Sequence, residues 1–240
     1  AQEEPMIEAF RQKRDPHMAN ASMIFGVPYE DVVAAKKIDK QVKEGVLPES
    51  ALTQRHHDLL GFRAAAKTLG FGLVYGMREG KLARDLKITK PEAVELRKKF
   101  MRQFPAVERL LTEAITDAIA LNCKSYTYLG RRRHLPALLA KRPLDRFQAE
   151  RQCVNLVVQG SAADLVRMAM LRVAELNLED SHHTFMLMQV HDELVFECPT
   201  EVADEVFPII KETMEHPFPR DLDVPIEVDG GRGHSWGTAK

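Results

Sequence analysis

Two apolar runs separated by only three polar residues constrain the fold more than any other feature of this sequence. Residues 185–190 (FMLMQV) and 194–196 (LVF) favour strands, and His191, Asp192 and Glu193 lie between them. So short a connection joins antiparallel strands, because a parallel crossover needs a dozen residues or more. The sequence therefore predicts a β-hairpin over 184–198 with an imidazole and two carboxylates at its bend. Because the flanking residues are strongly apolar, we expect this turn to lie close to the protein interior.

The remainder of the chain shows mostly helical spacing of apolar residues. We expect helices at 3–25 with a break near Asp15-Pro16, and at 30–44, 49–60, 62–77, 91–122, 144–177 and 200–216. A short hairpin over 125–136 and a final strand near 224–228 complete the expected elements. Many helices with a few antiparallel strands indicate an α+β fold.

Charge is distributed unevenly along the chain. The formal net charge of the 240 residues is −1, which gives no global signal for nucleic acid. Between residues 124 and 151, however, eight basic residues stand against two acidic ones, whereas acidic residues dominate from Glu179 onward. A local excess of this kind is typical of an anion-binding face.

Cysteine usage and hydropathy bound the setting of the protein. Cys123, Cys153 and Cys198 are widely spaced, which argues against a disulfide framework or a zinc site and indicates a reducing compartment. No apolar run approaches the roughly 18 residues of a membrane span, and no signal peptide precedes the first helix. We therefore expect no membrane partner and a cytoplasmic location, either of a cellular protein or of a viral protein in its host.

The stretch RAAAKTLGFGLVYG, residues 63–76, carries a stripe of chemically useful side chains. Arg63, Lys67, Phe71 and Tyr75 recur every four residues, so on a helix they form one slowly drifting row. Cations followed by flat rings suit a triphosphate attached to a sugar and base. The glycines on either side of Phe71 suggest that another group approaches closely there. The alternative is an ordinary amphipathic helix with basic residues on its solvent side.

Two further stretches suit a nucleic acid. Arg131, Arg132 and Arg133 follow one another at a predicted hairpin tip, where they can contact phosphates without reading sequence. Arg151, Asn155 and Gln159 fall at four-residue intervals, and the small residues 160–163 allow tight packing of another backbone. Amide side chains can bond base edges. A solvated basic loop and helix-capping or core polar groups are the respective alternatives.

The bend of the predicted hairpin suits a metal ion. Adjacent carboxylates such as Asp192 and Glu193 repel each other unless a cation lies beside them. Mg²⁺ commonly binds through one or two protein carboxylates together with substrate phosphates. The alternative is a turn with routine acidic residues.

Taken in order, these stretches resemble the family A DNA polymerases. RAAAKTLGFGLVYGM (63–77) is similar to the nucleotide-binding helix of the fingers, motif B, and VHDE (190–193) to motif C of the palm. LGRRRHLP (129–136) and RQCVNLVVQGSAADL (151–165) resemble segments that handle template and primer. DPHMANASMIFGVP (15–28) resembles the segment after motif A, and GRGHSW (231–236) the C-terminus. The resemblance implies a helical fingers subdomain and an antiparallel-sheet palm of an incomplete polymerase right hand.

The resemblance also implies a division of the chain. Residues 1–28 would form the segment that follows motif A, residues 29–122 the fingers with helix 62–77, and residues 123–240 the palm with hairpin 184–198. The segment 34–62 looks longer than the usual connection before the fingers helix.

The resemblance implies a role for each matching residue. Arg63 and Lys67 would hold the triphosphate, with Lys67 as a proton donor to pyrophosphate. His17 would touch the phosphates, Phe71 would stack on sugar and base, and Tyr75 would lie near the templating base. Asp192, supported by Glu193, would bind two Mg²⁺ ions. The DNA contacts it implies come from Arg131, Arg132, Arg133, Arg151, Asn155, Gln159, Gln189 and His191.

One part of the family pattern is missing from these 240 residues. Motif A supplies the second metal-binding aspartate, and no DYSQIE-like stretch occurs here. We therefore expect a C-terminal portion of a polymerase that is inactive alone. Its expected partners are primer-template DNA, dNTPs and an N-terminal portion that carries motif A and the thumb, with or without an exonuclease. The sequence leaves open a single-subunit RNA polymerase and a non-catalytic DNA-binding assembly subunit.

Overall fold

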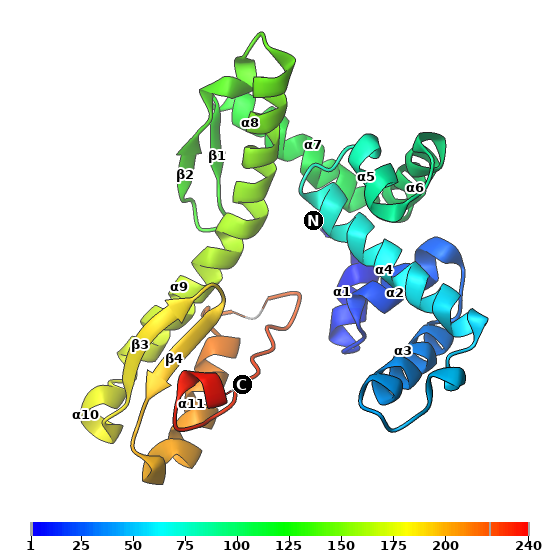
Figure 1. Ribbon diagram of the computed structural model, residues 1–240. Helices are drawn as coiled ribbons and strands as arrows, with labels where there is room; N and C mark the ends of the chain where they lie inside the picture. The colour runs from blue at the N-terminus through cyan, green and yellow to red at the C-terminus, as the bar shows by residue number, and fades with distance from the viewer. Residues whose placement is uncertain (1, 221, 240) are drawn as a thin grey trace. The chain divides into compact units, whose positions relative to one another are not determined.

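The chain folds into two compact units. A computed structural model describes residues 2–220 and 222–239 (Figure 1). Unit 1 comprises Ala1–Ser125 and His134–Val154, and unit 2 comprises Tyr126–Arg133 and Asn155–Lys240. The boundary passes through the strand pair β1 (Lys124–Tyr126) and β2 (Arg132–His134), and through the last residue of helix α8 (Pro143–Asn155).

Unit 1 is built from helices. Besides α8 it contains α1 (Glu4–Arg11), α2 (Pro16–Phe25), α3 (Tyr29–Lys43), α4 (Gln54–Val74), α5 (Glu79–Leu86), α6 (Lys90–Gln103) and α7 (Pro105–Ala120), with 3₁₀ turns at Glu49–Ala51 and Pro136–Leu139. Helix α4 packs against α2 and α3. Its fully buried Leu69 joins Ile24 of α2 and Phe100 of α6 in the main core. Burial of these large side chains fixes α4, which carries the predicted Arg63–Tyr75 stripe.

Unit 2 combines a hairpin with helices. It contains a π-helical turn at Leu156–Gly160, α9 (Ser161–Glu175), α10 (Leu178–His182), β3 (Phe185–Val190), β4 (Glu193–Glu197), α11 (Ala203–Glu215), and 3₁₀ turns at Thr200–Val202 and Trp236–Thr238. Strands β3 and β4 pair antiparallel, with Val190 opposite Glu193 and a bulge between Met186 and Met188. Their core partners are Val173 of α9 and Val206 of α11.

Capping groups explain where two of the unit 1 helices begin. Pro16 is the first residue of α2, and the Asp15 side chain accepts hydrogen bonds from the backbone N–H groups of His17 and Met18. The start of α7 is capped from a distance, because buried Glu3 accepts from the N–H groups of Ala106 and Val107. The cap by Asp15 can be recognised from the sequence, whereas the cap by Glu3 depends on the tertiary fold.

The structure confirms the α+β fold and most of the expected elements. The break near Asp15-Pro16, the hairpins at 125–136 and 184–198, and the helical path through 144–177 are all present. The regions 49–60 and 62–77, however, are not separate helices, because α4 runs through Gly61. Burial of Leu59 and Leu69 on either side offsets the roughly 1 kcal/mol that a glycine costs a helix. Helices α5 and α10 were not expected from the sequence.

Two further expectations were wrong. Among the described residues, 224–228 form no strand: Pro225 lacks an N–H donor, and the N–H of Val228 bonds the Glu215 side chain instead. The turn of the β3–β4 hairpin is also not buried within unit 2, since His191 and Asp192 are exposed, and Phe185, Leu187 and Met188 of β3 are 41%, 56% and 41% exposed. The reason is that β3–β4 is a two-stranded sheet whose Met186 and Phe196 pack on the helices while the opposite face stays open.

The remaining predictions on organisation are untested. The division at residues 28 and 122 stays a prediction, as does the unusual length of 34–62. That segment contains the end of α3, a 3₁₀ turn and the start of α4, and a small core around Val32, Ala35 and Leu59 holds it together.

None of the helices in the described parts of the chain is both long enough and apolar enough to span a bilayer.

Candidate nucleotide and metal sites

An ion pair anchors the first residue of the predicted stripe. In unit 1, Nη2 of Arg63 lies 2.7 Å from Oδ2 of Asp15, and both side chains are mostly buried. Burial of Asp15 by itself raises its pKa, but the hydrogen bonds from Arg63 and from the N–H of Met18 outweigh this and hold the pKa below its usual value. The carboxylate therefore stays ionised at neutral pH. Nε of Arg63 is buried and finds no partner among the described residues.

The next three residues of the stripe lie around one aromatic ring. Half-exposed Phe71 has the ring of His17 at 5.3 Å, that of Tyr75 at 6.5 Å, and Nζ of Lys67 at 6.0 Å. Burial lowers the pKa of His17, and although Asp15 opposes this, the charges of Arg63 and Lys67 add to it. The imidazole is thus neutral at physiological pH and can accept or donate a hydrogen bond beside the cations.

A cavity of about 580 Å³ adjoins this cluster within unit 1. Lys67, Phe71 and Tyr75 line it, and so does Phe147 of α8, over which the guanidinium of Arg78 stacks at 3.6 Å. Cavities of this size commonly hold small-molecule ligands. The combination of cations and aromatic rings suits an anion attached to a flat group.

Two glycines beside the cavity have identifiable neighbours. A Cβ at Gly72 would lie 2.6 Å from Cε of Met77, so the group that approaches there is a side chain of the same unit. Gly76 has φ +74° and its missing side chain leaves room for Arg151, whose Nε donates to the carbonyl of Tyr75 at 3.1 Å. Arg151 therefore lines the same cavity that the stripe lines.

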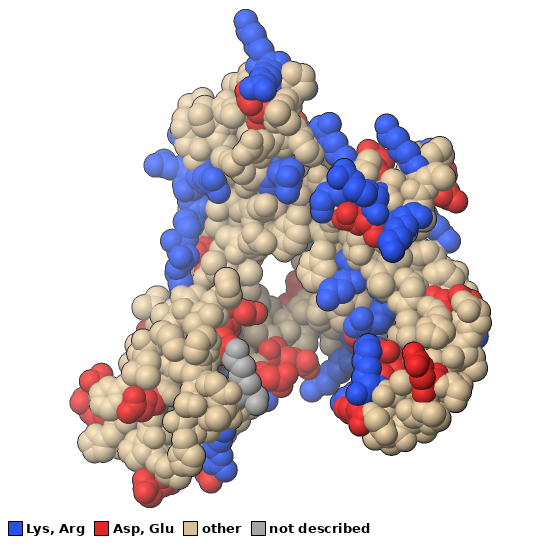
Figure 2. All heavy atoms as spheres, viewed as in Figure 1, with Lys and Arg blue, Asp and Glu red and all other residues tan. Residues whose placement is uncertain are grey.

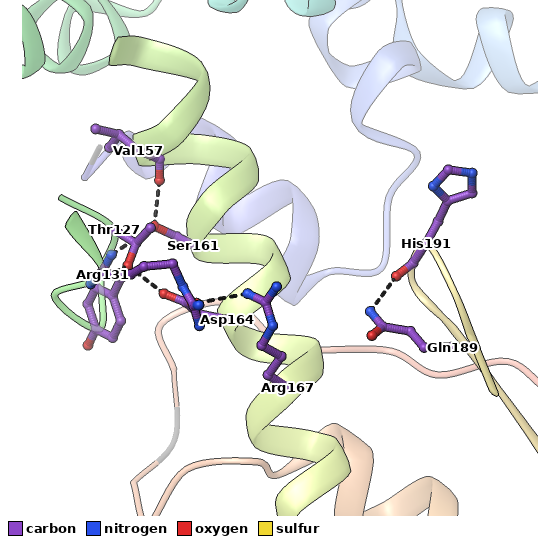
Figure 3. A network of polar contacts seen from close by, with 9 residues as sticks. Thr127, Arg131, Val157, Ser161, Asp164, Arg167, Gln189 and His191 are labelled. Atoms are coloured by element: carbon purple, nitrogen blue, oxygen red, sulfur yellow. Dashed lines mark hydrogen bonds and ion pairs between the residues drawn. The ribbon is translucent and has the colours of Figure 1, made fainter. Parts of the chain in front are cut away.

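In unit 2, the candidate metal ligands lie at a tight turn. His191 and Asp192 are the two residues between β3 and β4, both exposed, and Glu193 is the first residue of β4. His191 adopts φ +55°, and its carbonyl accepts a hydrogen bond from the amide of Gln189 at 2.9 Å. Figure 3 shows the imidazole of His191 pointing away from the hairpin. Adjacent carboxylates at a turn offer oxygen ligands to a hard cation such as Mg²⁺.

Asp164 of α9 is the centre of a second polar cluster in unit 2. It is 1% exposed, accepts from Thr127 Oγ1, and lies 2.8 Å from both Nε and Nη2 of Arg131, with Arg167 at 3.5 Å (Figure 3). Burial raises the pKa of Asp164, but the hydrogen bonds from Thr127 and Arg131 outweigh burial and lower it. This ionised carboxylate fixes Arg131 at the hairpin.

The small residues after Gln159 pack against the same hairpin. A Cβ at Gly160 would lie 2.8 Å from Thr127, and Ser161 Oγ accepts from the N–H of Tyr128 at 2.8 Å. The groups closest to Gly160 are therefore side chains, and the backbone of Tyr128 contacts this stretch through the hydroxyl of Ser161. The π-helical turn over Leu156–Gly160 interrupts the four-residue spacing predicted for Asn155 and Gln159, because such a turn holds more residues than an α-helical one.

The other predicted DNA-contact residues differ in their surroundings. Arg132 and Arg133 are exposed and form no ion pair within the described residues, and Lys and Arg atoms gather along the β1–β2 hairpin in Figure 2. Gln159 is exposed, whereas Oδ1 of Asn155 is buried without a partner among the described residues.

The structure thus unites Arg63, Lys67, Phe71, Tyr75 and Arg151 with His17 in unit 1. It places Asp192, Glu193, Gln189 and His191 on one hairpin of unit 2. Sequence reasoning missed the two anchoring aspartates, Asp15 and Asp164. An Asp-Pro pair before a helix could have revealed Asp15, whereas an aspartate among small residues gave no such signal for Asp164. In the described part of the chain, no group of three or more His, Cys, Asp or Glu side chains converges to hold a metal.

Comparison with known protein families shows which family has these clusters of residues. The profile of DNA polymerase family A matches residues 52–238. The chain belongs to DNA polymerase family A. The match includes α4, the β1–β2 hairpin and the β3–β4 hairpin, so the family resemblance of these motifs is confirmed.

Individual family A relatives agree. The chain is 37% identical over 240 residues to DNA polymerase I, thermostable, of Thermus aquaticus, covering 99% of this chain and 25% of that protein. It is 34% identical over 239 residues to DNA polymerase I of Mycobacterium leprae, covering 100% of this chain and 23% of that one.

A solved structure of the same family matches the fold. It is described as the POL domain of Pol1 from M. smegmatis in complex with DNA primer-template and dNTP, and it superposes with a TM-score of 0.81 at 33% identity. The match covers 99% of this chain and 37% of that one. The chain spans about a quarter of the length of the curated relatives it matches.

Proposed function

We propose that this chain carries the nucleotide-binding helix and one side of the metal site of a DNA-templated DNA polymerase, which adds dNTPs to a primer 3′ end. Family A membership supports this, and the related M. smegmatis domain is described with primer-template and dNTP. The observation that carries the proposal is the convergence of Lys67, His17 and Tyr75 around Phe71 beside a cavity of about 580 Å³.

In unit 1, each side chain of the cluster has a role in nucleotide binding. Lys67 and Arg63 hold the triphosphate, and Lys67 donates a proton to the departing pyrophosphate. The neutral imidazole of His17 bonds a phosphate oxygen, and Phe71 stacks on the sugar and base. Tyr75 lies beside the templating base. Cations already fixed before binding stabilise the charge that develops on the transferred phosphate.

In unit 2, Asp192 binds the divalent metal and Glu193 supports it. The donor set fits Mg²⁺, because both groups offer carboxylate oxygens at an exposed turn. When bound, two such ions supply positive charge to the attacking and leaving oxygens of phosphoryl transfer. Gln189 and His191 face the primer terminus. Arg131, Arg132 and Arg133 contact backbone phosphates, and Arg151, Asn155 and Gln159 line the duplex near the new base pair.

Two carboxylates on one hairpin supply only one side of a two-metal site. We therefore propose that the partner aspartate and the rest of the site come from a polymerase portion with motif A and a thumb, and that these 240 residues alone are inactive. Extension of a primer by the 240-residue chain with Mg²⁺ and dNTPs would contradict this.

The three cysteines are all free thiols, which supports the proposal of a reducing, cytoplasmic setting.

Primer extension by the complete polymerase tests the proposal. We expect Lys67→Ala and Asp192→Asn each to lower kcat by at least about 100-fold, whereas Lys98→Ala and Asp180→Asn, which remove the same charges from exposed helix positions, leave it unchanged. Unchanged extension by Asp192→Asn would favour a non-catalytic assembly role. Efficient use of rNTPs in place of dNTPs would favour an RNA polymerase.

A further inference from the structure

The C-terminal segment contacts a carboxylate of the candidate metal hairpin. The indole Nε1–H of Trp236 donates a hydrogen bond to Oε1 of Glu193, the first residue of β4. Trp236 begins the 3₁₀ turn Trp236–Thr238, which a reciprocal cap between Ser235 and Thr238 closes. The hydrogen bond therefore joins an ordered turn to the carboxylate, and it spans 43 residues of sequence.

The segment that leads to Trp236 is fixed along α11. The N–H of Val228 bonds Oε1 of Glu215 at 2.9 Å, near the end of this helix. Further on, a Cβ at Gly230 would lie 2.5 Å from the ring of Phe207, so the backbone lies against that ring. Arg232 then pairs with Asp204 near the start of α11. We call residues 228–236 the C-terminal strap.

The order of these contacts gives the strap a direction. Successive strap residues contact positions 215, 207 and 204, so the strap runs antiparallel to α11, and its last residue, Trp236, bonds Glu193 at the start of β4. Glycine at 230 is required for the close approach to Phe207, and the cap at Ser235 ends the segment at Trp236. Three separate anchors therefore converge on the placement of one indole.

We infer that Trp236 is a positioning residue that orients the carboxylate of Glu193 for the metal site, so that the C-terminal strap is part of the polymerase machinery. This rests on the proposed function of Asp192 and Glu193. The indole N–H donates to Oε1, and Oε2 accepts no hydrogen bond from the described residues, which leaves Oε2 for a cation or a metal-bound water. A hydrogen bond of this kind fixes the rotation of a ligand and is typical of the groups that surround metal sites.

The contact itself can be tested without any catalysis. The 240-residue chain contains a single tryptophan, so its ¹⁵N-labelled form has one indole N–H resonance in a two-dimensional NMR spectrum. We expect this resonance to shift in Glu193→Gln and to shift further in Glu193→Ala. Glu197→Gln, at the other end of β4, is the matched control and leaves it unchanged. If the chemical shift of the indole N–H resonance is unchanged in both Glu193 variants, the inference is overturned.

The positioning role is tested in the complete polymerase. Trp236→Phe keeps the ring and removes the donor, and we expect the Mg²⁺ concentration for half-maximal extension to rise about tenfold while KM for dNTP stays unchanged. Trp236→His, which retains a ring N–H, restores part of the Mg²⁺ affinity. A purely structural role of the strap would instead lower the yield of folded enzyme and leave the Mg²⁺ requirement unchanged, and that result overturns the inference.

The two experiments separate failure of this inference from failure of the proposed function. If Asp192→Asn extends primers normally, the proposed metal role fails, whatever the indole resonance shows. If Asp192→Asn is inactive while Trp236→Phe has an ordinary Mg²⁺ requirement, the polymerase proposal stands and the strap has no part in it.

Discussion

Two Asp–Arg pairs, one in each unit, hold arginines that the sequence had marked as phosphate contacts, but they do so in opposite ways. In unit 1, Asp15 and Arg63 share their burial, with side chains 30% and 22% exposed. In unit 2, Asp164 is 1% exposed whereas Arg131 is 52% exposed. The first pair lies within the packed helices, and the second buries its anion and leaves its cation in solvent.

The difference teaches what each arginine can still do. The ion pair with Asp15 holds the Arg63 side chain in place within the packed helices. Arg63 therefore supplies a positive charge at a fixed position beside Lys67 and His17. Arg131 uses Nε and Nη2 on Asp164, and its half-exposed side chain leaves the rest of the guanidinium in contact with solvent. A cation fixed on one side and open on the other suits a long anion such as a nucleic acid backbone, which contacts many such groups in turn.

The largest expected effect comes from removing the buried anion. We expect Asp164→Ala to lower the free energy of unfolding by about 2–4 kcal/mol, because buried Thr127 loses its acceptor and Arg131 its partner. Urea denaturation measures this. Asp145→Asn, which removes an exposed charge 3.9 Å from Arg142, should change it by less than about 0.5 kcal/mol. A loss below about 1 kcal/mol in Asp164→Ala would contradict the expectation that the buried anion of unit 2 is the stronger anchor.

The next effect separates the two tasks of Asp15. Asp15→Ala removes both the cap of α2 and the partner of Arg63, and we expect it to cost about 2 kcal/mol. Asp15→Asn retains a capping side chain and loses only the charge, so it should cost about 1 kcal/mol. The same denaturation measurement applies. Equal losses in the two variants would mean that the ion pair, and not the cap, accounts for the effect.

Lowering the pH should remove the stability that the ionised carboxylates of Asp15 and Asp164 contribute. Their pKa values lie below the ordinary 3.8 in the folded state, so the stability they contribute is present above that value and is lost as pH falls through the lowered folded pKa. We therefore expect the unfolding free energy of the wild type to fall as the pH drops below 4, and to fall less steeply in Asp164→Asn and Asp15→Asn. Parallel curves for wild type and variants would contradict this.

The smallest effect concerns His17. Its pKa is lowered from 6.5 in the folded state, chiefly by burial, so its contribution to stability is present above pH 6.5 and is lost as pH falls through the folded pKa. A small loss of stability below pH 6.5 should be present in the wild type and absent in His17→Asn. Denaturation at pH 7.5 and 5.5 measures it. His182, whose Nε2 lies 3.3 Å from Glu205 in unit 2, provides a control position: His182→Asn should retain the His17 effect.

The sequence by itself determined the local elements and the residues of the candidate site. Asp15-Pro16 marked the start of α2, and the run from Val190 to Glu193 marked a hairpin, because caps and short turns depend on neighbouring residues. The four-residue spacing of the stripe from Arg63 to Tyr75 predicted that these side chains share one row of a helix, which is α4. Motif order was enough to predict the polymerase family.

Only the tertiary structure decided which groups hold those residues in place. Asp15 lies 48 residues from Arg63, Thr127 lies 37 from Asp164, and Glu193 lies 43 from Trp236. No periodicity relates such positions, since their contacts follow from how helices and strands pack and not from spacing along the chain. The same holds for the strand expected at 224–228: it does not form, because Pro225 cannot donate to a sheet and the N–H of Val228 bonds the Glu215 side chain of α11 instead.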